Sequence, residues 1–128
     1  MKKISLLGWL VFCLALLAQA QNTETDTDKK AIRQVMADQE AAWNRADLEG
    51  FMQGYWKSDS LRFIGSRGLT YGWQATLDNY KKSYPGAEAM GKLTLGIVSL
   101  EMLSPENAFM IGKWRLVRTK DEDRKSVV

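Results

Sequence analysis

The spacing of apolar residues predicts three amphipathic helices between residues 29 and 84. The first helix, residues 29–46, has its apolar positions three and four residues apart or at sums of these: Ile32, Val35, Met36, Trp43 and Ala46. The second is short and follows Asp47, which suits an N-cap; its apolar positions are Leu48, Phe51, Met52 and Tyr55. The third follows Gly72 and stops at Pro85-Gly86, with its stripe at Trp73, Leu77, Tyr80 and Tyr84.

The spacing of apolar residues then changes from the period of a helix to the period of a strand. Residues 61–64 and 69–71 can pair through the glycine-rich turn between them, and residues 92–102 and 108–118 form a long hairpin around Pro105. Both faces of the last strand carry apolar residues, which indicates that both are partly covered. Helices would cover one face and a partner subunit the other. Helices followed by antiparallel strands predict an α+β domain.

The first twenty residues have the layout of an export signal. A short basic start precedes an apolar run over residues 4–17, and Ala18-Gln19-Ala20 supplies small residues before a cleavage point. The run is too short to span a bilayer and stay there, so we expect no stable membrane insertion after cleavage. The expected location is the periplasm or the outside of the cell. The predicted divisions of the chain are a signal at 1–20, a flexible lead at 21–28, one domain at 29–118 and a polar tail at 119–128.

The amino-acid composition restricts the chemistry that this chain can perform. The 128 residues include no histidine, and the single cysteine, Cys13, lies inside the predicted signal. The mature chain therefore lacks the commonest general base and metal ligand, and it has no thiol. We expect no metal site and no cofactor. Removing Lys2 and Lys3 from the 18 basic residues leaves 16 against 15 acidic residues, a balance that does not favour nucleic acid as a partner.

Aromatic side chains around one polar residue are the candidate binding site. Gln39 falls in the middle of the first apolar stripe, where a buried amide needs a partner. That partner is either backbone or water, or Gln39 faces a cavity. Trp43, Tyr55, Trp56 and Trp114 would then form the wall of a pocket for a small apolar ligand. The alternative is that these rings are ordinary core.

Several segments resemble a known fold. Residues 43–51 (WNRADLEGF) are similar to a corner, W-N-x-G-D-L-x-G-F, between the first two helices of the nuclear transport factor two-like superfamily, which includes SnoaL-like and ketosteroid-isomerase-like domains. Residues 59–65 (DSLRFIG), 71–73 (YGW) and the A-x-M-x-G-x-W-x-L strand at 108–116 continue the resemblance. It implies a cone-shaped roll, with three N-terminal helices packed on a curved, mostly antiparallel sheet.

Two departures from this family matter. The proton-shuttling carboxylate of ketosteroid isomerases matches Ile64 or Gly65 here, and the family's tyrosine donor matches Gln39. No catalytic residue is carried over, so the chain leans away from enzymatic function. The family also has two further strands after the one ending near Arg118, so the last two strands of the fold are expected to be missing. The chain would then be a truncated copy or be completed by another chain.

The favoured hypothesis is a non-catalytic module that binds a small apolar ligand and forms a homodimer through the outer face of the sheet. Two alternatives stay open. One is an isomerase- or dehydratase-type enzyme with Glu101 as its base, because strict alternation puts Glu101 on the same face as Leu93, Leu95 and Ile97. The other is an oligomerisation or interaction domain.

Overall fold

The computed structural model describes residues 6–118 and 124–127, and the side chains of residues 25–118. Its helices are α1 (Leu6–Asn44), α2 (Leu48–Met52), α3 (Trp73–Ser83) and α4 (Ala87–Met90). Its strands are β1 (Arg62–Gly65), β2 (Gly68–Tyr71), β3 (Lys92–Ser104), β4 (Asn107–Val117) and β5 (Arg124–Val127). Strands β1 and β2 pair in one antiparallel sheet, and β3, β4 and β5 pair in that order in another. The predicted α+β architecture is confirmed.

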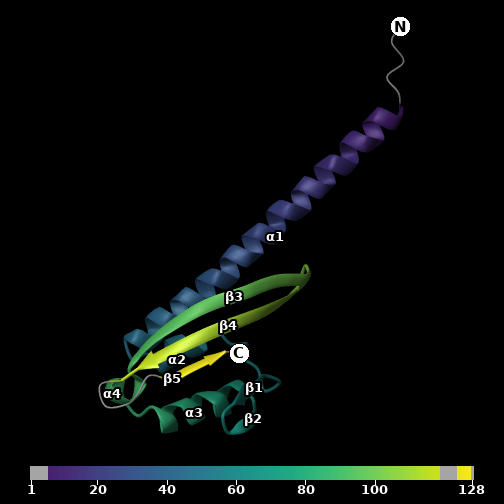
Figure 1. Cartoon of the computed structure of the whole chain (residues 1–128). Coiled ribbons are helices and arrows are strands. Elements are labelled where there is room, and N and C mark those ends of the chain that lie inside the picture. Colours follow the sequence, from purple (N-terminus) through teal and green to yellow (C-terminus); the bar gives the residue numbers. More distant parts are fainter. Residues whose placement is uncertain (1–5, 119–123, 128) are drawn as a thin grey trace.

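Helix α1 lies along the long β3–β4 hairpin, and its first part extends past the tip of that hairpin (Figure 1). Residues 21–28, where the sequence predicted a flexible lead, are helical. The physical reason is local: residues 9–49 contain neither glycine nor proline, so nothing interrupts the helix. The side chains of the predicted signal lie outside the described residues. Within the described part of the chain, no helix is both long and apolar enough to cross a membrane.

The corner between α1 and α2 forms as the sequence predicts. Ala46 adopts a positive φ of 62°, which turns the chain out of α1. Asp47 then caps α2, because its side chain accepts a hydrogen bond from the Gly50 N–H at 2.7 Å. Such a cap satisfies one of the backbone donors that a helix start leaves without a partner.

Two side chains of α1 cover the backbone edge of β3. The Leu93 N–H donates to Asn44 Oδ1 at 2.8 Å, and Asn44 Nδ2 donates back to the Leu93 carbonyl at 2.9 Å. The Leu95 N–H donates to Glu40 Oε2 at 2.7 Å. Four residues of helix rise about 6 Å and two residues of strand about 6.6 Å, so the two spacings match. Asn44 and Glu40 thus replace a neighbouring strand and protect this edge.

A β-bulge at Val98 reverses the faces of β3. The pairing runs from Ile97 with Gly112 to Ser99 with Ile111, so Val98 is the extra residue. Beyond it Glu101 pairs with Phe109, whereas before it Leu95 pairs with Trp114, on the opposite face. The prediction that Glu101 shares the face of Leu93, Leu95 and Ile97 is therefore wrong. Glu101 is exposed on the outer face of the sheet.

The core lies where α1, α2 and α3 meet the inner face of β3 and β4. Its buried apolar side chains are Ala42, Trp43, Phe51, Met52, Trp73, Leu77, Met90, Leu93 and Leu116. Two elements go beyond the sequence prediction. Helix α4 precedes β3, and β5 lies within the predicted polar tail, paired with residues 113–116 of β4. The edge of β4 offers backbone hydrogen bonds to any extended segment, whatever its side chains.

Candidate functional site

Six aromatic rings form one connected cluster where α1, α2, α3 and β1 meet. The members of this aromatic cluster are Trp43, Phe51, Tyr55, Phe63, Tyr80 and Tyr84. Neighbouring ring centroids lie between 4.9 Å and 6.0 Å apart, and most rings meet edge to face. Trp43 and Phe51 are buried, whereas the three tyrosines keep part of their surface exposed. The cluster is therefore solid core at its tryptophan end and reaches the surface at its tyrosine end.

Gln39 brings a polar group to this cluster. Gln39 is only 7% exposed, and its Nε2 donates to the Phe51 carbonyl at 3.0 Å. The Tyr55 phenol interacts with both Tyr80 and Gln39. Of the two alternatives left open by the sequence, the one with Gln39 bonded to backbone is the one the structure adopts.

Burial sets the protonation of these phenols. Desolvation raises the pKa of Tyr55, although its hydrogen bonds to Tyr80 and Gln39 oppose the shift. Desolvation also raises the pKa of Tyr80 far above the ordinary range, and the neighbouring Tyr55 raises it further. Both groups stay neutral at physiological pH. They can give and accept hydrogen bonds but are not poised to shuttle protons.

The five residues predicted to bind a ligand do not form one wall. Gln39 interacts with Tyr55, and Trp43 belongs to the same aromatic cluster as Tyr55. Trp114 reaches the core from β4 and is half-buried there. Trp56 is 66% exposed.

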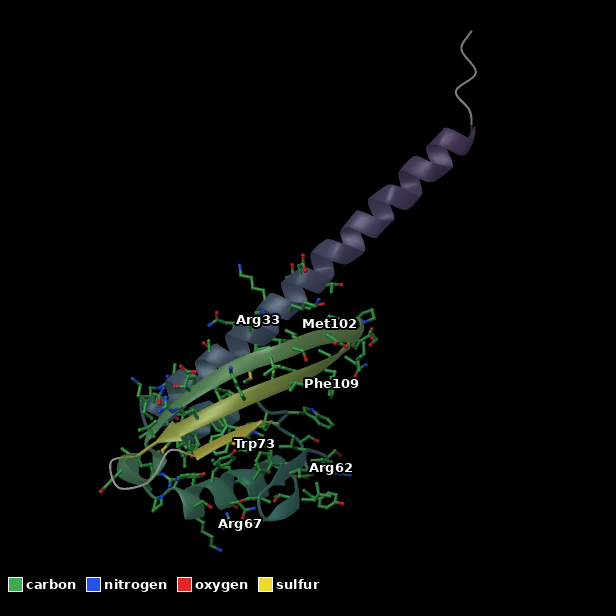
Figure 2. All side chains as sticks on the ribbon, viewed as in Figure 1. Arg33, Arg62, Arg67, Trp73, Met102 and Phe109 are labelled. Carbon is green, nitrogen blue, oxygen red and sulfur yellow. The ribbon has the colours of Figure 1, made fainter. Side chains whose placement is uncertain are left out.

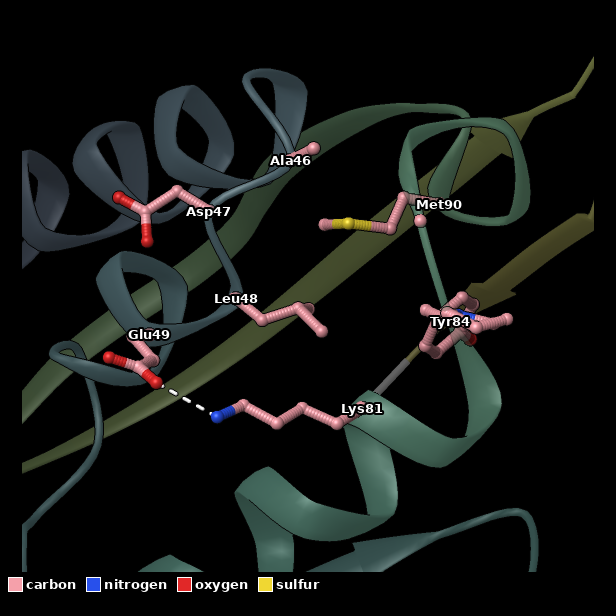
Figure 3. Close-up of a pocket in the computed structure, with 9 residues that line it drawn as sticks. Ala46, Asp47, Leu48, Glu49, Lys81, Tyr84 and Met90 are labelled. Carbon is pink, nitrogen blue, oxygen red and sulfur yellow. Dashed lines mark hydrogen bonds and ion pairs between the residues drawn. The ribbon is translucent and has the colours of Figure 1, made fainter.

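A pocket of about 440 Å³ opens beside the tryptophan end of the cluster, between the start of α2, the end of α3 and α4 (Figure 3). Leu48, Tyr84 and Met90 make up the apolar part of its lining, and Asp47, Glu49 and Lys81 make up a polar part of similar extent. Tyr84 packs on Trp43 at 4.9 Å, and the Met90 carbonyl accepts the Trp43 Nε1–H at 3.0 Å. Trp43 thus lies behind the pocket lining without being part of it.

Charged groups form the rim of this pocket. Lys81 Nζ lies 2.8 Å from Glu49 Oε1, and Figure 3 shows this ion pair linking α3 to α2. The Glu49 hydrogen bond raises the pKa of Lys81, and the Gly50 N–H followed by Arg45 lowers the pKa of Asp47. Both shifts concern exposed groups, so they say little about stability. Among the described side chains, no group of acidic residues, cysteines or histidines could hold a metal ion.

The pattern of the sequence does not predict this pocket. Its lining comes from a helix start, a helix end and the four-residue helix α4, which no periodicity could predict. The available signal was the break at Pro85-Gly86, which turns the chain away from α3 and leaves Tyr84 at the opening.

Known structures share this arrangement of helices and strands. The crystal structure of an NTF-2-like protein of unknown function from Shewanella oneidensis MR-1 is 41% identical, with a TM-score of 0.74, over 78% of this chain and 82% of that one. The chain belongs to the NTF-2-like family. A domain of unknown function with a cystatin-like fold, from Nostoc punctiforme PCC 73102, shares the fold at 22% identity and a TM-score of 0.67. That match covers 79% of this chain and 64% of the other.

Searches against family sequence models and against curated proteins give no match. The family assignment of this NTF-2-like domain therefore depends on the structural comparison. Neither of these two proteins has a stated function, so a role has to be argued from this chain's own residues.

In this NTF-2-like domain, Ile64 and Gly65, the two candidates for the catalytic-carboxylate position, lie on opposite faces of β1. Phe63 points into the aromatic cluster, and alternation along β1 turns Ile64 outward, where it is 76% exposed. A Cβ built on Gly65 would lie 3.0 Å from the Phe63 ring, so Gly65 is on the inner face. The inward position of the two is thus a glycine, which has no group to move a proton.

Proposed function

We propose that this NTF-2-like domain is a non-catalytic module that binds a small, largely apolar molecule in the pocket between α2, α3 and α4. The observation that carries the proposal is that the aromatic cluster and the pocket share Tyr84. Ligand sites combine an apolar wall with a few fixed polar groups. Leu48, Tyr84 and Met90 supply such a wall here, and Lys81 with Glu49 supplies the polar rim.

Trp43 has a supporting role in this proposal. It holds Met90 through its indole N–H and packs on Tyr84, so it fixes two lining residues at once. Of the other residues predicted from the sequence, Gln39, Tyr55 and Trp114 stiffen the core behind the pocket. Trp56 has no part in it.

Amide chemical shifts of the labelled protein, recorded against a library of hydrophobic metabolites, test the proposal. A hit should perturb Leu48, Tyr84 and Met90 and leave the β1–β2 hairpin unchanged. Leu48→Trp should fill the pocket and weaken that ligand at least tenfold, while Leu69→Trp, at an exposed site, should not. A library without a hit, or shifts confined to other surfaces, would contradict the proposal.

We also propose that two copies associate through the outer face of β3 and β4. Phe109 is 52% exposed there, and Val98 and Val117 are exposed as well. Phe109, Ile111 and Val98 form a short apolar row on this face, and Lys113 and Arg115 lie between it and Val117. Exposed apolar patches of this kind mark contact sites. A dimer would cover this row and leave the pocket on the other side of the sheet open.

For location, the amino-terminal pattern supports export to the periplasm or beyond. The proposal predicts cleavage before Gln21 in the natural host. Mass spectrometry of the protein recovered outside the cytoplasm would detect a chain beginning at Gln21, and an intact chain from Met1 would contradict export.

A further inference from the structure

The β1–β2 hairpin presents apolar and basic side chains together on one exposed face. Arg62 pairs with Tyr71 and Ile64 pairs with Leu69, and alternation puts all four on the same side. We call these four residues the hairpin face. Ile64, Tyr71 and Leu69 are 76%, 59% and 48% exposed. The opposite side of the hairpin carries Phe63, which packs in the aromatic cluster.

The charged side chains of this hairpin are all basic. Residues 61–71 include Arg62 and Arg67 and no acidic residue. The Arg62 guanidinium lies 4.4 Å from the centre of the Tyr71 ring and donates one N–H to the Ser60 carbonyl. Arg67, in the turn, donates to Ser83 of α3. Both arginines remain exposed, and Figure 2 shows them at the lower edge of the molecule, away from Arg33.

We propose that the hairpin face attaches the protein to the surface of a membrane rich in anionic phospholipid. Ile64 and Leu69 would enter the boundary between headgroups and acyl chains, and Tyr71 would lie at headgroup level, where amphipathic rings are favoured. Arg62 would bind a lipid phosphate directly, and Arg67 would do so after leaving its hydrogen bond to Ser83 of α3. This is attachment to a surface, with no segment crossing the bilayer.

The size of the face favours lipid over a protein partner. Four side chains of this kind offer on the order of a few hundred Å², whereas a stable protein complex buries about 800 Å² on each partner. A bilayer needs no matching contour, so a few inserted side chains and two phosphate contacts are enough for reversible binding. Residues 61–71 carry no carboxylate that would repel anionic headgroups, and Asp59 lies at the base of the hairpin beside Gly72.

A fluorescent label at position 64 tests the proposal in the full chain. In a Cys13→Ser background, Ile64→Cys carries an environment-sensitive NBD group, and Leu103→Cys, at the exposed end of the β3–β4 hairpin, is the matched control. Vesicles of phosphatidylcholine with 30% phosphatidylglycerol should shift the emission of the label at 64 to the blue and raise it at least twofold. The label at 103 should not respond.

The arginines are tested in the same background. Arg62→Gln with Arg67→Gln should weaken binding to the anionic vesicles on the order of 30-fold at low salt. Both substitutions are on the surface, and a thermal melt checks that the fold is kept.

Any of four results would overturn the proposal. The label at 64 would not respond to anionic vesicles, or it would respond equally to neutral ones, or labels at 64 and 103 would respond alike. A response that grows with protein concentration in the absence of vesicles would assign the face to a second copy, and would also overturn it. The pocket experiment is unaffected by these outcomes, because Leu48 and Tyr84 lie on other elements.

Discussion

Gly91, which joins α4 to β3, shows how close packing sets the identity of a single residue. Its φ is 61°, in the region that favours glycine. A Cβ built at this position would lie 2.4 Å from the Val117 carbonyl oxygen, and a backbone atom cannot move aside as a side-chain end can. Gly86, at the other end of α4, has an extended φ of 164° and open space around it.

Gly91→Ala is therefore expected to lower the free energy of unfolding by about 2 kcal/mol, from backbone strain and the clash with Val117. Gly86→Ala should change it by less than about 0.5 kcal/mol. Urea denaturation followed by circular dichroism measures both. Equal effects of the two substitutions would show that the change in unfolding free energy comes from the loss of glycine's conformational freedom. The clash with Val117 would then not be its cause.

The buried phenols give a prediction about alkaline pH. Because the pKa of Tyr80 is raised in the folded state, its neutral form stabilises the fold fully below pH 10, the ordinary tyrosine pKa. Above pH 10 the unfolded chain loses this proton first, so stability falls as pH rises. Ultraviolet titration at 295 nm should show that Tyr80→Phe leaves the ionisation step of the folded protein near pH 10 unchanged. Tyr80→Phe should also move alkaline unfolding to higher pH. A smaller ionisation step near pH 10 in this variant would contradict the prediction.

At the scale of elements, the docking of α1 on β3 joins a helix to a strand edge through side chains alone. Asn44 satisfies both backbone groups of Leu93, and Glu40 satisfies the N–H of Leu95. The match between helix rise and strand rise becomes visible only when the two elements are side by side.

Asn44→Ala removes two hydrogen bonds and leaves the Leu93 backbone without partners in a half-buried place. The expected loss is about 2 kcal/mol of unfolding free energy. Asp38→Ala on the same helix, which removes only an exposed contact to Gln34, should cost under about 0.5 kcal/mol. Chemical denaturation of both variants provides the comparison. A loss for Asn44→Ala no larger than for Asp38→Ala would mean that water replaces the amide at the edge.

At the scale of the whole molecule, exposed apolar side chains gather on two separate surfaces. One is the outer face of β3 and β4 around Phe109, and the other is the hairpin face. Their chemistry differs, since the hairpin face lies in a segment whose only charges are arginines, whereas Glu101 pairs with Phe109 on the sheet. We therefore assign the sheet surface to a second copy and the hairpin surface to lipid.

Phe109→Lys is expected to convert a dimer into a monomer, because it places a charge within the proposed contact. Light scattering coupled to size exclusion should then report about one chain mass, 14.5 kDa before any cleavage. Leu69→Lys, on the hairpin face, should remain dimeric. A wild-type protein that is already monomeric at high concentration, or that forms larger rings, would contradict the dimer.

Much of the fold follows from local sequence signals. Apolar spacing placed the second half of α1, α2 and α3, and the turns at Gly65–Gly68 and Pro105 placed both hairpins. Asp47 was recognisable as a cap because capping involves only neighbouring residues. The segments that resemble the NTF-2-like family span these same corners, which is why the family was predictable before any coordinates.

The candidate site was less predictable, because burial depends on which elements meet. Trp43 and Trp56 have the same indole, yet one is buried against α4 and the other is 66% exposed. No property of the residue itself distinguishes them. The pocket likewise depends on α4, a four-residue helix held by its neighbours.

The sequence by itself determined the order and type of most elements, since periodicity and caps act over a few residues. Only the tertiary structure decided which faces those elements turn inward. One extra residue at Val98 moved Glu101 from the predicted inner face to the outer one, because side chains alternate with a period of two. Whether a strand contains such a bulge is set by its pairing with another strand, and that pairing is a long-range contact.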